Sequence, residues 1–159
     1  MIQYRLFTAT IAKRLWLLLL AACVVAVCAT TTHAREPQAK LNTIPVQIND
    51  IEIEVEVAST GQQRTRGLSY RKHLASNSGM LFVYQKTLPL IFTMRETSIP
   101  LSIAFISEDF VINEIHKMEP WALQNYPARL PARYALEVNQ GWFEKNGIKV
   151  GDRLKMSFK

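Results

Sequence analysis

The sequence is poor in the residues that carry the commonest catalytic and metal-binding chemistries. Its two cysteines, Cys23 and Cys28, both lie in the apolar N-terminal region, so the rest of the chain has no disulfide, thiol nucleophile or cysteine–metal site. Beyond residue 34 the chain has two histidines, His73 and His116, and neither has a second ligand at helical or zinc-site spacing. The sequence therefore predicts no metal site and no cofactor.

Motifs of the common enzyme classes are missing as well. No serine stands in a Gly-x-Ser-x-Gly turn, and the chain has no phosphate-binding or dinucleotide-binding glycine pattern. These absences argue against the hydrolases, phosphotransferases and oxidoreductases that leave local motifs, whereas a scattered acid–base site stays open. We therefore expect a protein that is not an enzyme, with a small hydrolase or isomerase as the alternative.

Acidic residues are absent from positions 1–34, which have the three-part layout of a secretory signal. Three basic residues precede an apolar run over 15–29, and Thr32 and Ala34 then place small residues where a signal peptidase reads the chain. As a helix this run spans about 22 Å, less than the roughly 30 Å of a bilayer core, which favours cleavage after Ala34 over a permanent span. Two alternatives stay open: lipidation of Cys23, whose preceding Leu-Ala-Ala fits a lipoprotein signal, and an uncleaved anchor.

Positive charge is modest once this segment is removed. The net charge of +6 falls to +3, because 16 basic side chains then oppose 13 acidic ones, and no long basic run remains. We predict no nucleic-acid partner. The expected organisation is a signal peptide over 1–34, a polar tether over 35–43 and one domain over 44–159. The domain is expected in the periplasm or outside the cell, touching a membrane only through an uncleaved or lipidated N-terminal segment.

The domain reads as a series of short strands. Residues 51–57 alternate strictly, which predicts a half-buried strand whose three glutamates, Glu52, Glu54 and Glu56, face water. Capping residues predict two short helices: Thr60 with Gln63 before a helix over 61–68, and Asn139 before a helix over 141–146. Residues 119–130 read as a long loop. The fold class is α+β, mostly β: a curled, barrel-like antiparallel sheet of seven or eight short strands with two short helices.

The best candidate for a site is the polar hinge at 95–98, which lies between two apolar runs and ends at Pro100. Met94, Arg95 and Glu96 group a thioether, a guanidinium and a carboxylate beside this bend, and arginine in such a place suits a carboxylate or phosphate ligand. The alternative is a structural ion pair, Arg95 with Glu96, that holds the turn.

Five ordered segments, 64–68, 79–84, 92–106, 131–138 and 146–152, resemble the bacterial and archaeal family known as domain of unknown function 192. The resemblance covers roughly residues 50–158 and implies the barrel-like fold without implying an established activity. Relatives usually have tryptophan, lysine, asparagine and aspartate where this chain has Thr93, Arg95, Glu96 and Ser102. The comparison suggests that an acid has moved across the bend, so that Glu96 meets the basic partner, Arg66 or Arg95, of the missing aspartate.

These observations predict an exported accessory domain of the cell envelope that binds a small polar ligand, a peptide or an envelope partner. The alternatives are an enzyme with a scattered site that uses His116, Glu114 or Glu96, and a structural envelope scaffold. The expected ligand-binding residues are Arg66, Met94, Arg95, Glu96, Ser102 and Arg133.

Export is testable on protein isolated from its native envelope. Because small residues precede Arg35, mass spectrometry is expected to find the N-terminus at Arg35. An intact Met1 would contradict this prediction, and a diacylated Cys23 would establish the lipoprotein alternative.

Overall fold

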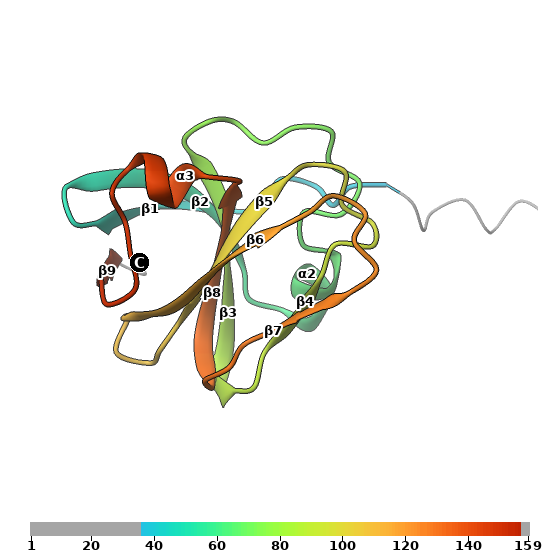
Figure 1. The fold of residues 1–159 in the computed structure, drawn as a ribbon. Coiled ribbons are helices and arrows are strands. Elements are labelled where there is room, and N and C mark those ends of the chain that lie inside the picture. The colour runs from blue at the N-terminus through green and yellow to red at the C-terminus, as the bar shows by residue number, and fades with distance from the viewer. Residues whose placement is uncertain (1–35, 157–159) are drawn as a thin grey trace, which may run out of the picture. The chain divides into compact units, whose positions relative to one another are not determined.

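Nine strands and two short helices make up residues 36–156, the part of the chain that the computed structural model describes (Figure 1). The elements are β1 (Thr43–Ile48), β2 (Ile51–Ala58), α2 (Gly61–Arg66), β3 (Ser78–Leu88), β4 (Ile91–Thr93), β5 (Leu101–Ile106), β6 (Ile112–Met118), β7 (Asn125–Pro127), β8 (Ala132–Asn139), α3 (Trp142–Lys145) and β9 (Leu154–Met156). Seven strands form one sheet in the order β6-β5-β8-β3-β2-β1-β9, and β4 pairs with β7. The expected signal peptide lies outside the described residues.

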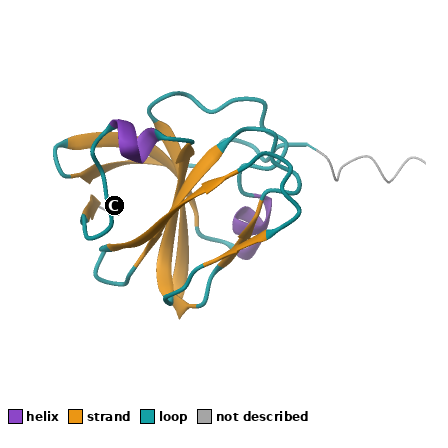
Figure 2. Ribbon diagram, viewed as in Figure 1, coloured by secondary structure: helices purple, strands orange, loops and turns teal. Residues whose placement is uncertain are grey.

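The sheet is mixed and strongly curled, which confirms the predicted mostly-β, barrel-like class (Figure 2). One detail of the expected antiparallel sheet is wrong, because β2 and β3 pair in parallel. Parallel neighbours need a crossover connection, and α2 with the loop that follows it supplies one. The two edge strands of the order, β6 and β9, approach each other because the sheet curls, and an isolated bridge joins Val111, just before β6, to Arg153, just before β9.

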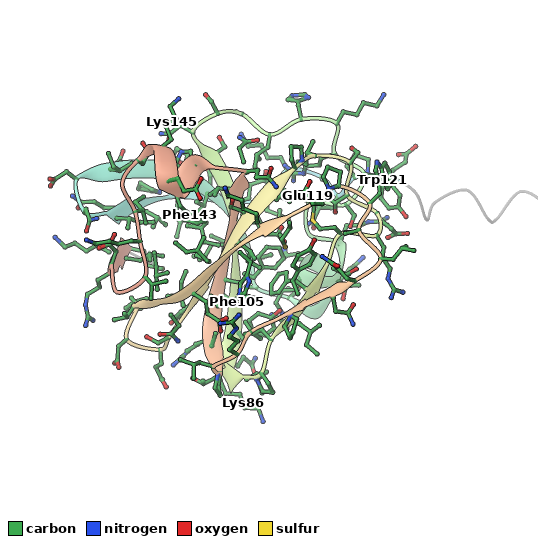
Figure 3. All side chains as sticks on the ribbon, in the orientation of Figure 1. Lys86, Phe105, Glu119, Trp121, Phe143 and Lys145 are labelled. Atoms are coloured by element: carbon green, nitrogen blue, oxygen red, sulfur yellow. The ribbon has the colours of Figure 1, made fainter. Side chains whose placement is uncertain are left out.

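The central strands are covered on both faces. All six residues of β5 are buried, and alternate residues of β5, β8 and β3 enter two hydrophobic clusters. The first cluster contains Leu136 of β8 and Phe143 of α3, and the second contains Phe82 of β3 and Phe105 of β5. Figure 1 shows α3, β1 and β9 on one side of these strands and α2, β4 and β7 on the other. In Figure 3, Phe105 lies inside the domain, whereas Lys86 and Lys145 project from its edge.

Local capping was predicted well for one helix and wrongly for the other. Thr60 and Gln63 form the expected capping box of α2. Helix α3, in contrast, follows Gly141, and the Asn139 amide donates to the carbonyls of the 74–75 segment instead of capping α3. Asn139 still belongs to β8, where strand pairing directs its side chain away from the helix start. The expected loop at 119–130 includes β7.

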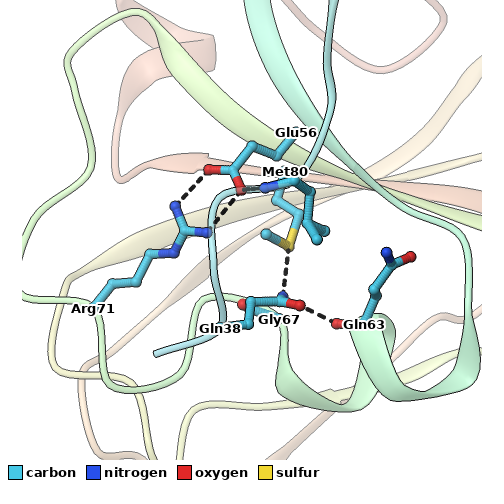
Figure 4. Close-up of polar contacts among 7 residues, drawn as sticks. Gln38, Glu56, Gln63, Gly67, Arg71 and Met80 are labelled. Atoms are coloured by element: carbon cyan, nitrogen blue, oxygen red, sulfur yellow. Dashed lines mark hydrogen bonds and ion pairs between the residues drawn. The ribbon is translucent and has the colours of Figure 1, made fainter. Parts of the chain in front are cut away.

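The prediction that all three glutamates of β2 face water is wrong for Glu56. Glu52 and Glu54 are exposed, but Glu56 is only 5% exposed and pairs with Arg71 through contacts of 2.5 and 2.8 Å (Figure 4). Burial alone raises the pKa of Glu56, but hydrogen bonds from Arg71 and from the Leu41 N–H, with the charges of Arg71 and Lys40, outweigh it and lower the pKa. The pair ties β2 to the segment after α2.

The segment expected to be a tether lies on the domain from Gln38 onward. The Gln38 amide donates to the carbonyls of Gln63 and Gly67 at 3.2 and 2.8 Å, which satisfies acceptors at the end of α2 (Figure 4). Leu41 donates its N–H to Glu56 at 2.7 Å and packs against the second cluster. Residues 38–42 thus brace the helix.

Removing Arg71 should test how strongly the buried pair constrains the fold. We expect Arg71→Met to lower the free energy of unfolding in urea by about 3 kcal/mol, because it leaves the Glu56 carboxylate buried without its cation. The double variant Glu56→Gln with Arg71→Met should recover most of that loss.

Lys117→Met provides the matched control, because it breaks an exposed pair with Glu144. It should cost less than about 1 kcal/mol. Equal costs for Arg71→Met and Lys117→Met would contradict the structural role of the buried pair.

Candidate functional site

A hollow of about 220 Å³ opens between α2, β3 and β4, and a glutamate of β8 reaches it. We call it the Glu137 hollow. Its polar lining comes from α2, β3, the hinge and β8, and its apolar lining comes from aromatic and aliphatic side chains. The lining residues are Arg64, Thr65, Arg66, Gly67, Leu68, Ser69, Phe82, Tyr84, Ile91, Phe92, Thr93, Thr97 and Glu137.

Glu137 is the unusual member of this set. It is 4% exposed, it shares the face of Ala135 in the second cluster, and its partners on the neighbouring strands are Met80 and Ile103. Within residues 36–156, no hydrogen bond or ion pair reaches its carboxyl group. Desolvation by these apolar neighbours raises the pKa of Glu137 to about 8, so the group is a neutral acid near pH 7.

Close packing fixes the position of Glu137. Gly79 of β3 faces Val138 in the strand register, and a Cβ atom added at Gly79 would lie 2.6 Å from the backbone oxygen of Glu137. Only a residue without a side chain lets the two strands approach this closely. The register then sets where the Glu137 side chain enters the hollow.

Two arginines of the short helix α2 add positive charge to the hollow. Arg64 donates to the carbonyl of Val83 at 2.9 Å, and its guanidinium lies 4.6 Å from the centre of the Tyr84 ring. Burial raises the pKa of Tyr84, the Arg64 charge lowers it and the Glu137 charge raises it, with a net upward shift. Arg66 lies 5.6 Å from the centre of the Tyr70 ring.

The predicted hinge at 95–98 lies beside the hollow and is held by contacts with neighbouring segments. Glu96 accepts a short hydrogen bond from the Tyr70 hydroxyl, and its carbonyl accepts from the Tyr70 N–H at 2.8 Å. Tyr70 thereby connects the hinge to Arg66. Trp121 donates its N–H to the carbonyl of Thr97 at 3.0 Å, so the hinge is held from both sides. Tyr70 and Trp121 both have positive φ, of 64° and 59°, a costly backbone conformation for aromatic residues.

The six residues predicted for the site lie in different places. Arg66 lines the Glu137 hollow, whereas Met94 is fully buried in the second cluster. Arg95 is exposed and donates to the carbonyl of Leu123 at 3.3 Å. Arg133 pairs with Glu108, outside the hollow. The hinge contributes Thr97 to the lining of the hollow, whereas Arg95 and Glu96 are not among its lining residues.

The expected exchange of an acid across the bend is contradicted. Ser102 is buried, and its hydroxyl accepts from the N–H of Gly141 at 3.1 Å, next to α3. Glu96 contacts Tyr70, after α2, on the other side of the sheet. Alternation along β5 explains the error, because Ser102 shares its face with Ala104 of the first cluster, whereas Met94, just before the hinge, belongs to the second cluster.

The acid–base pair considered from the sequence has a structural role. His116 contacts Glu114 at 2.9 Å, and Glu114 also accepts from the N–H groups of Arg129 and Leu130 at 2.5 and 3.0 Å. Burial raises the pKa of Glu114, but these hydrogen bonds and the His116 charge outweigh it and lower the pKa. The carboxylate thus anchors the segment after β7, and neither His116 nor Glu114 lines the Glu137 hollow.

A second, larger hollow of about 560 Å³ lies between the N-terminal segment and the 70–75 loop, and His73 lines it. Its buried acid, Glu56, already has Arg71 and the Leu41 N–H as partners. The Glu137 hollow is therefore the better candidate for a site. No group of three His, Cys, Asp or Glu side chains among residues 36–156 is placed to hold a metal ion.

Comparison with known protein families places the chain. Residues 44–156 match the model of domain of unknown function 192, described as "Uncharacterized ACR, COG1430". The chain belongs to this family. A comparison with curated proteins found no match.

Two crystal structures of similar proteins share the fold of this family member. One, a proposed transcription regulator from Sinorhizobium meliloti 1021, is 32% identical with a TM-score of 0.72, over 75% of this chain and 97% of its own. The other, a protein of unknown function from Novosphingobium aromaticivorans DSM 12444, is 30% identical with a TM-score of 0.69, over 79% of this chain and 94% of its own. Within residues 36–156, no helix is long and apolar enough to cross a membrane.

Glu137 was not predicted as a site residue, although it lies in 131–138, one of the five segments that resemble the family. The available signal was a single acid inside the apolar run 134–138 of a strand expected to be central. An acid in such a run is exposed or paired in most proteins, and the strand pattern alone does not show that Glu137 is neither.

Glu137 should make the stability of the domain fall as the pH rises. Its folded pKa of about 8 lies above the ordinary value of 4.5, so its contribution is complete below about pH 4.5 and is lost as the pH rises towards 8. We expect the difference in unfolding free energy between wild type and Glu137→Gln to move by a few kcal/mol in favour of the variant between pH 5 and 8. Urea titrations measure it.

Glu52→Gln, which removes an exposed carboxylate on β2, is the control. Its difference from wild type should change much less over the same range. A constant difference for Glu137→Gln would show that the buried carboxyl is ionised throughout.

Proposed function

We propose that this protein is an exported, non-enzymatic domain of the cell envelope that binds a small organic ligand in the Glu137 hollow. The observation that carries the proposal is the carboxyl of Glu137, which is buried in a concave site without a partner among the described residues. A buried polar group without a partner costs stability, and an apolar residue would avoid that cost. Departures of this kind from good packing are expected at functional sites.

The composition of the hollow supports binding. Ligand sites are concave and mostly apolar, with a few polar groups that converge on the ligand. Here Phe82, Phe92 and Leu68 give the apolar surface, and Arg66 and Glu137 add polar groups. A volume of about 220 Å³ suits a ligand smaller than a typical drug.

Proton-transfer catalysis is the second candidate, and one observation favours it. A pKa of about 8 lies near the usual operating pH, where a general acid or base is most effective. The other ionisable groups that line the hollow are Arg64, Arg66 and Tyr84. Arginine stays protonated, and the raised pKa of Tyr84 makes it a poor acid, so no second acid or base completes the site.

A scaffold or partner-binding role would depend on exposed apolar surface instead of a hollow. Among residues 36–156, five large apolar side chains are more than half exposed: Ile91, Trp121, Leu123, Leu130 and Val150. Ile91 lies in β4, three of the others lie in the loops on either side of β7, and Val150 lies before β9. Single exposed apolar residues are normal on protein surfaces. A role like that of the proposed transcription regulator from Sinorhizobium meliloti 1021 is a weaker candidate, because the proposed export would separate the domain from DNA.

A thermal-shift screen of small organic molecules against the purified protein tests the proposal. A compound at a hundred times its dissociation constant stabilises the folded state by about 2.7 kcal/mol. We expect compounds that stabilise wild type to have no effect on Thr93→Trp, because the indole fills the entrance of the hollow at an exposed position of β4.

Lys155→Trp, at an exposed position of β9, is the matched control and should respond as wild type does. Arg95→Ala tests the original hinge hypothesis: loss of binding there, with Thr93→Trp unaffected, would move the site to the hinge. The absence of any stabilising compound would contradict the proposal.

A further inference from the structure

We propose that the outer edge of β4 binds an extended peptide as a third strand, and that the central side chain of the peptide enters the Glu137 hollow. Strand addition of this kind takes its affinity from backbone hydrogen bonds and its specificity from side-chain pockets. The inference extends the proposed function and rests on it in one respect, that the hollow accepts an organic group.

The register of the β4–β7 pair defines which backbone groups of β4 take part in it. Ile91 stands opposite Pro127, which has no N–H to donate, and Ala128 donates its N–H to the carbonyl of Leu90 at 2.8 Å. The pair of Ile91 and Pro127 is therefore a non-hydrogen-bonded one.

Alternation along the ladder then fixes the rest of β4. Phe92 shares backbone hydrogen bonds with its partner Tyr126, whereas Ile91 and Thr93 direct their N–H and C=O groups away from β7. Across residues 36–156, β4 has no other strand partner, and no backbone hydrogen bond from outside the β4–β7 pair reaches Ile91 or Thr93. The outer edge of β4 thus presents a donor and an acceptor from each of these two residues.

The Glu137 hollow lies along this edge. Ile91, Phe92 and Thr93 all line it, although successive side chains of a strand point to opposite faces. A hollow on one face of β4 would be lined by alternate residues, so a lining of three consecutive residues places it beside the edge. Helix α2 lines the other side, and a volume of about 220 Å³ suits one short segment of chain better than a second folded domain.

The two edges of the β4–β7 pair differ. Pro127 on β7 removes a donor that an added strand would need, which is a common protection of exposed edges. The β4 edge has only uncharged residues that favour strands, and Ile91 is 64% exposed. Two strands alone are marginally stable, so a third strand would stabilise the pair. The C-terminal strand β9 lies on the opposite side of the domain, which favours a separate peptide as the third strand (Figure 1).

The hollow selects the central residue of the peptide. Residues opposite one another in a sheet point to the same face, so the peptide residue opposite Phe92 points to the side of the Phe92 ring. That side is apolar, because Phe82 meets Phe92 edge to face at 4.9 Å and Leu68 lines the hollow with them. We expect an aliphatic residue there, between two polar residues that face outward beside Ile91 and Thr93.

Four capped peptides test the pairing on the purified protein. The parent, acetyl-Ser-Thr-Leu-Thr-Ser-amide, places leucine opposite Phe92, and a second peptide has glutamate in place of leucine. N-methylation of both threonines removes the N–H groups that point to β4, whereas N-methylation of the leucine alters only the far edge and is the matched control. Titrations followed by ¹⁵N chemical shifts should show that the glutamate and threonine-methylated peptides bind at least tenfold more weakly than the parent. The leucine-methylated peptide should bind within about threefold of it.

Amide exchange identifies the bonds that form. In the protein alone, the amides of Ile91 and Thr93 should exchange rapidly, and saturating parent peptide should slow both at least tenfold. The Phe92 amide should change less, because it already bonds to Tyr126.

A pair of variants at position 91 provides a second test. Ile91→Pro removes one donor of the edge without removing a bond to β7, so it should weaken the parent peptide about tenfold. Ile91→Thr keeps the N–H and should bind within about threefold of wild type. Chemical shifts retained across the rest of the domain show that Ile91→Pro is folded, and the methylated peptides decide the question if it is not.

Three results would overturn the inference. They are failure of the parent peptide to bind, equal affinities of the two methylated peptides, and slow exchange of the Ile91 and Thr93 amides in the protein alone. The last would mean that a second copy or the chain's own terminus occupies the edge. The proposed function stands in each case if compounds from the thermal-shift screen bind in the hollow, and both fail if neither peptides nor compounds bind.

Discussion

The constraint on which the rest of the structure depends is that β5, β8 and β3 are covered on both faces. A strand in this position has no face on which to place a polar side chain in water, so each needs apolar partners above and below. Helix α3 with β1 and β9 supplies one cover, and α2 with the β4–β7 pair supplies the other. The acid at Glu137 stands out because it occurs among these buried apolar side chains, where it lines the Glu137 hollow.

Local signals predicted the local structure of the chain. The capping box of α2 depends on Thr60 and Gln63, three residues apart, and the β5–β6 hairpin depends on the turn at 108–109. The fold class also followed, because short alternating runs and tight turns leave few alternatives. The parallel pairing of β2 with β3 did not follow, since it depends on where α2 packs and not on the pattern of either strand.

Partners distant in sequence account for what could not be predicted. In the sequence, Glu56 cannot be distinguished from Glu52 and Glu54, because only the fold brings Arg71 against it. The sequence around Asn139 is typical of a helix cap, but in the fold its side-chain amide donates to the carbonyls of the 74–75 segment. The candidate site shows the same limit. The residue types at 95–98 predicted a site at the hinge, but Glu96 accepts a hydrogen bond from Tyr70 instead. The acid in the hollow is Glu137, which belongs to β8, a strand over 30 residues further along the chain.

The tight approach at Gly79 has a consequence for how this family can vary. Any side chain at position 79 would collide with the backbone oxygen of Glu137. The position of the acid therefore depends partly on Gly79, which lines neither the Glu137 hollow nor the larger hollow beside Glu56. In the proposed binding site, a substitution at Gly79 that widened the spacing between β3 and β8 would move Glu137 while every residue that lines the hollow stays the same. A survey of family members that compares only the lining residues would overlook this route to a new specificity.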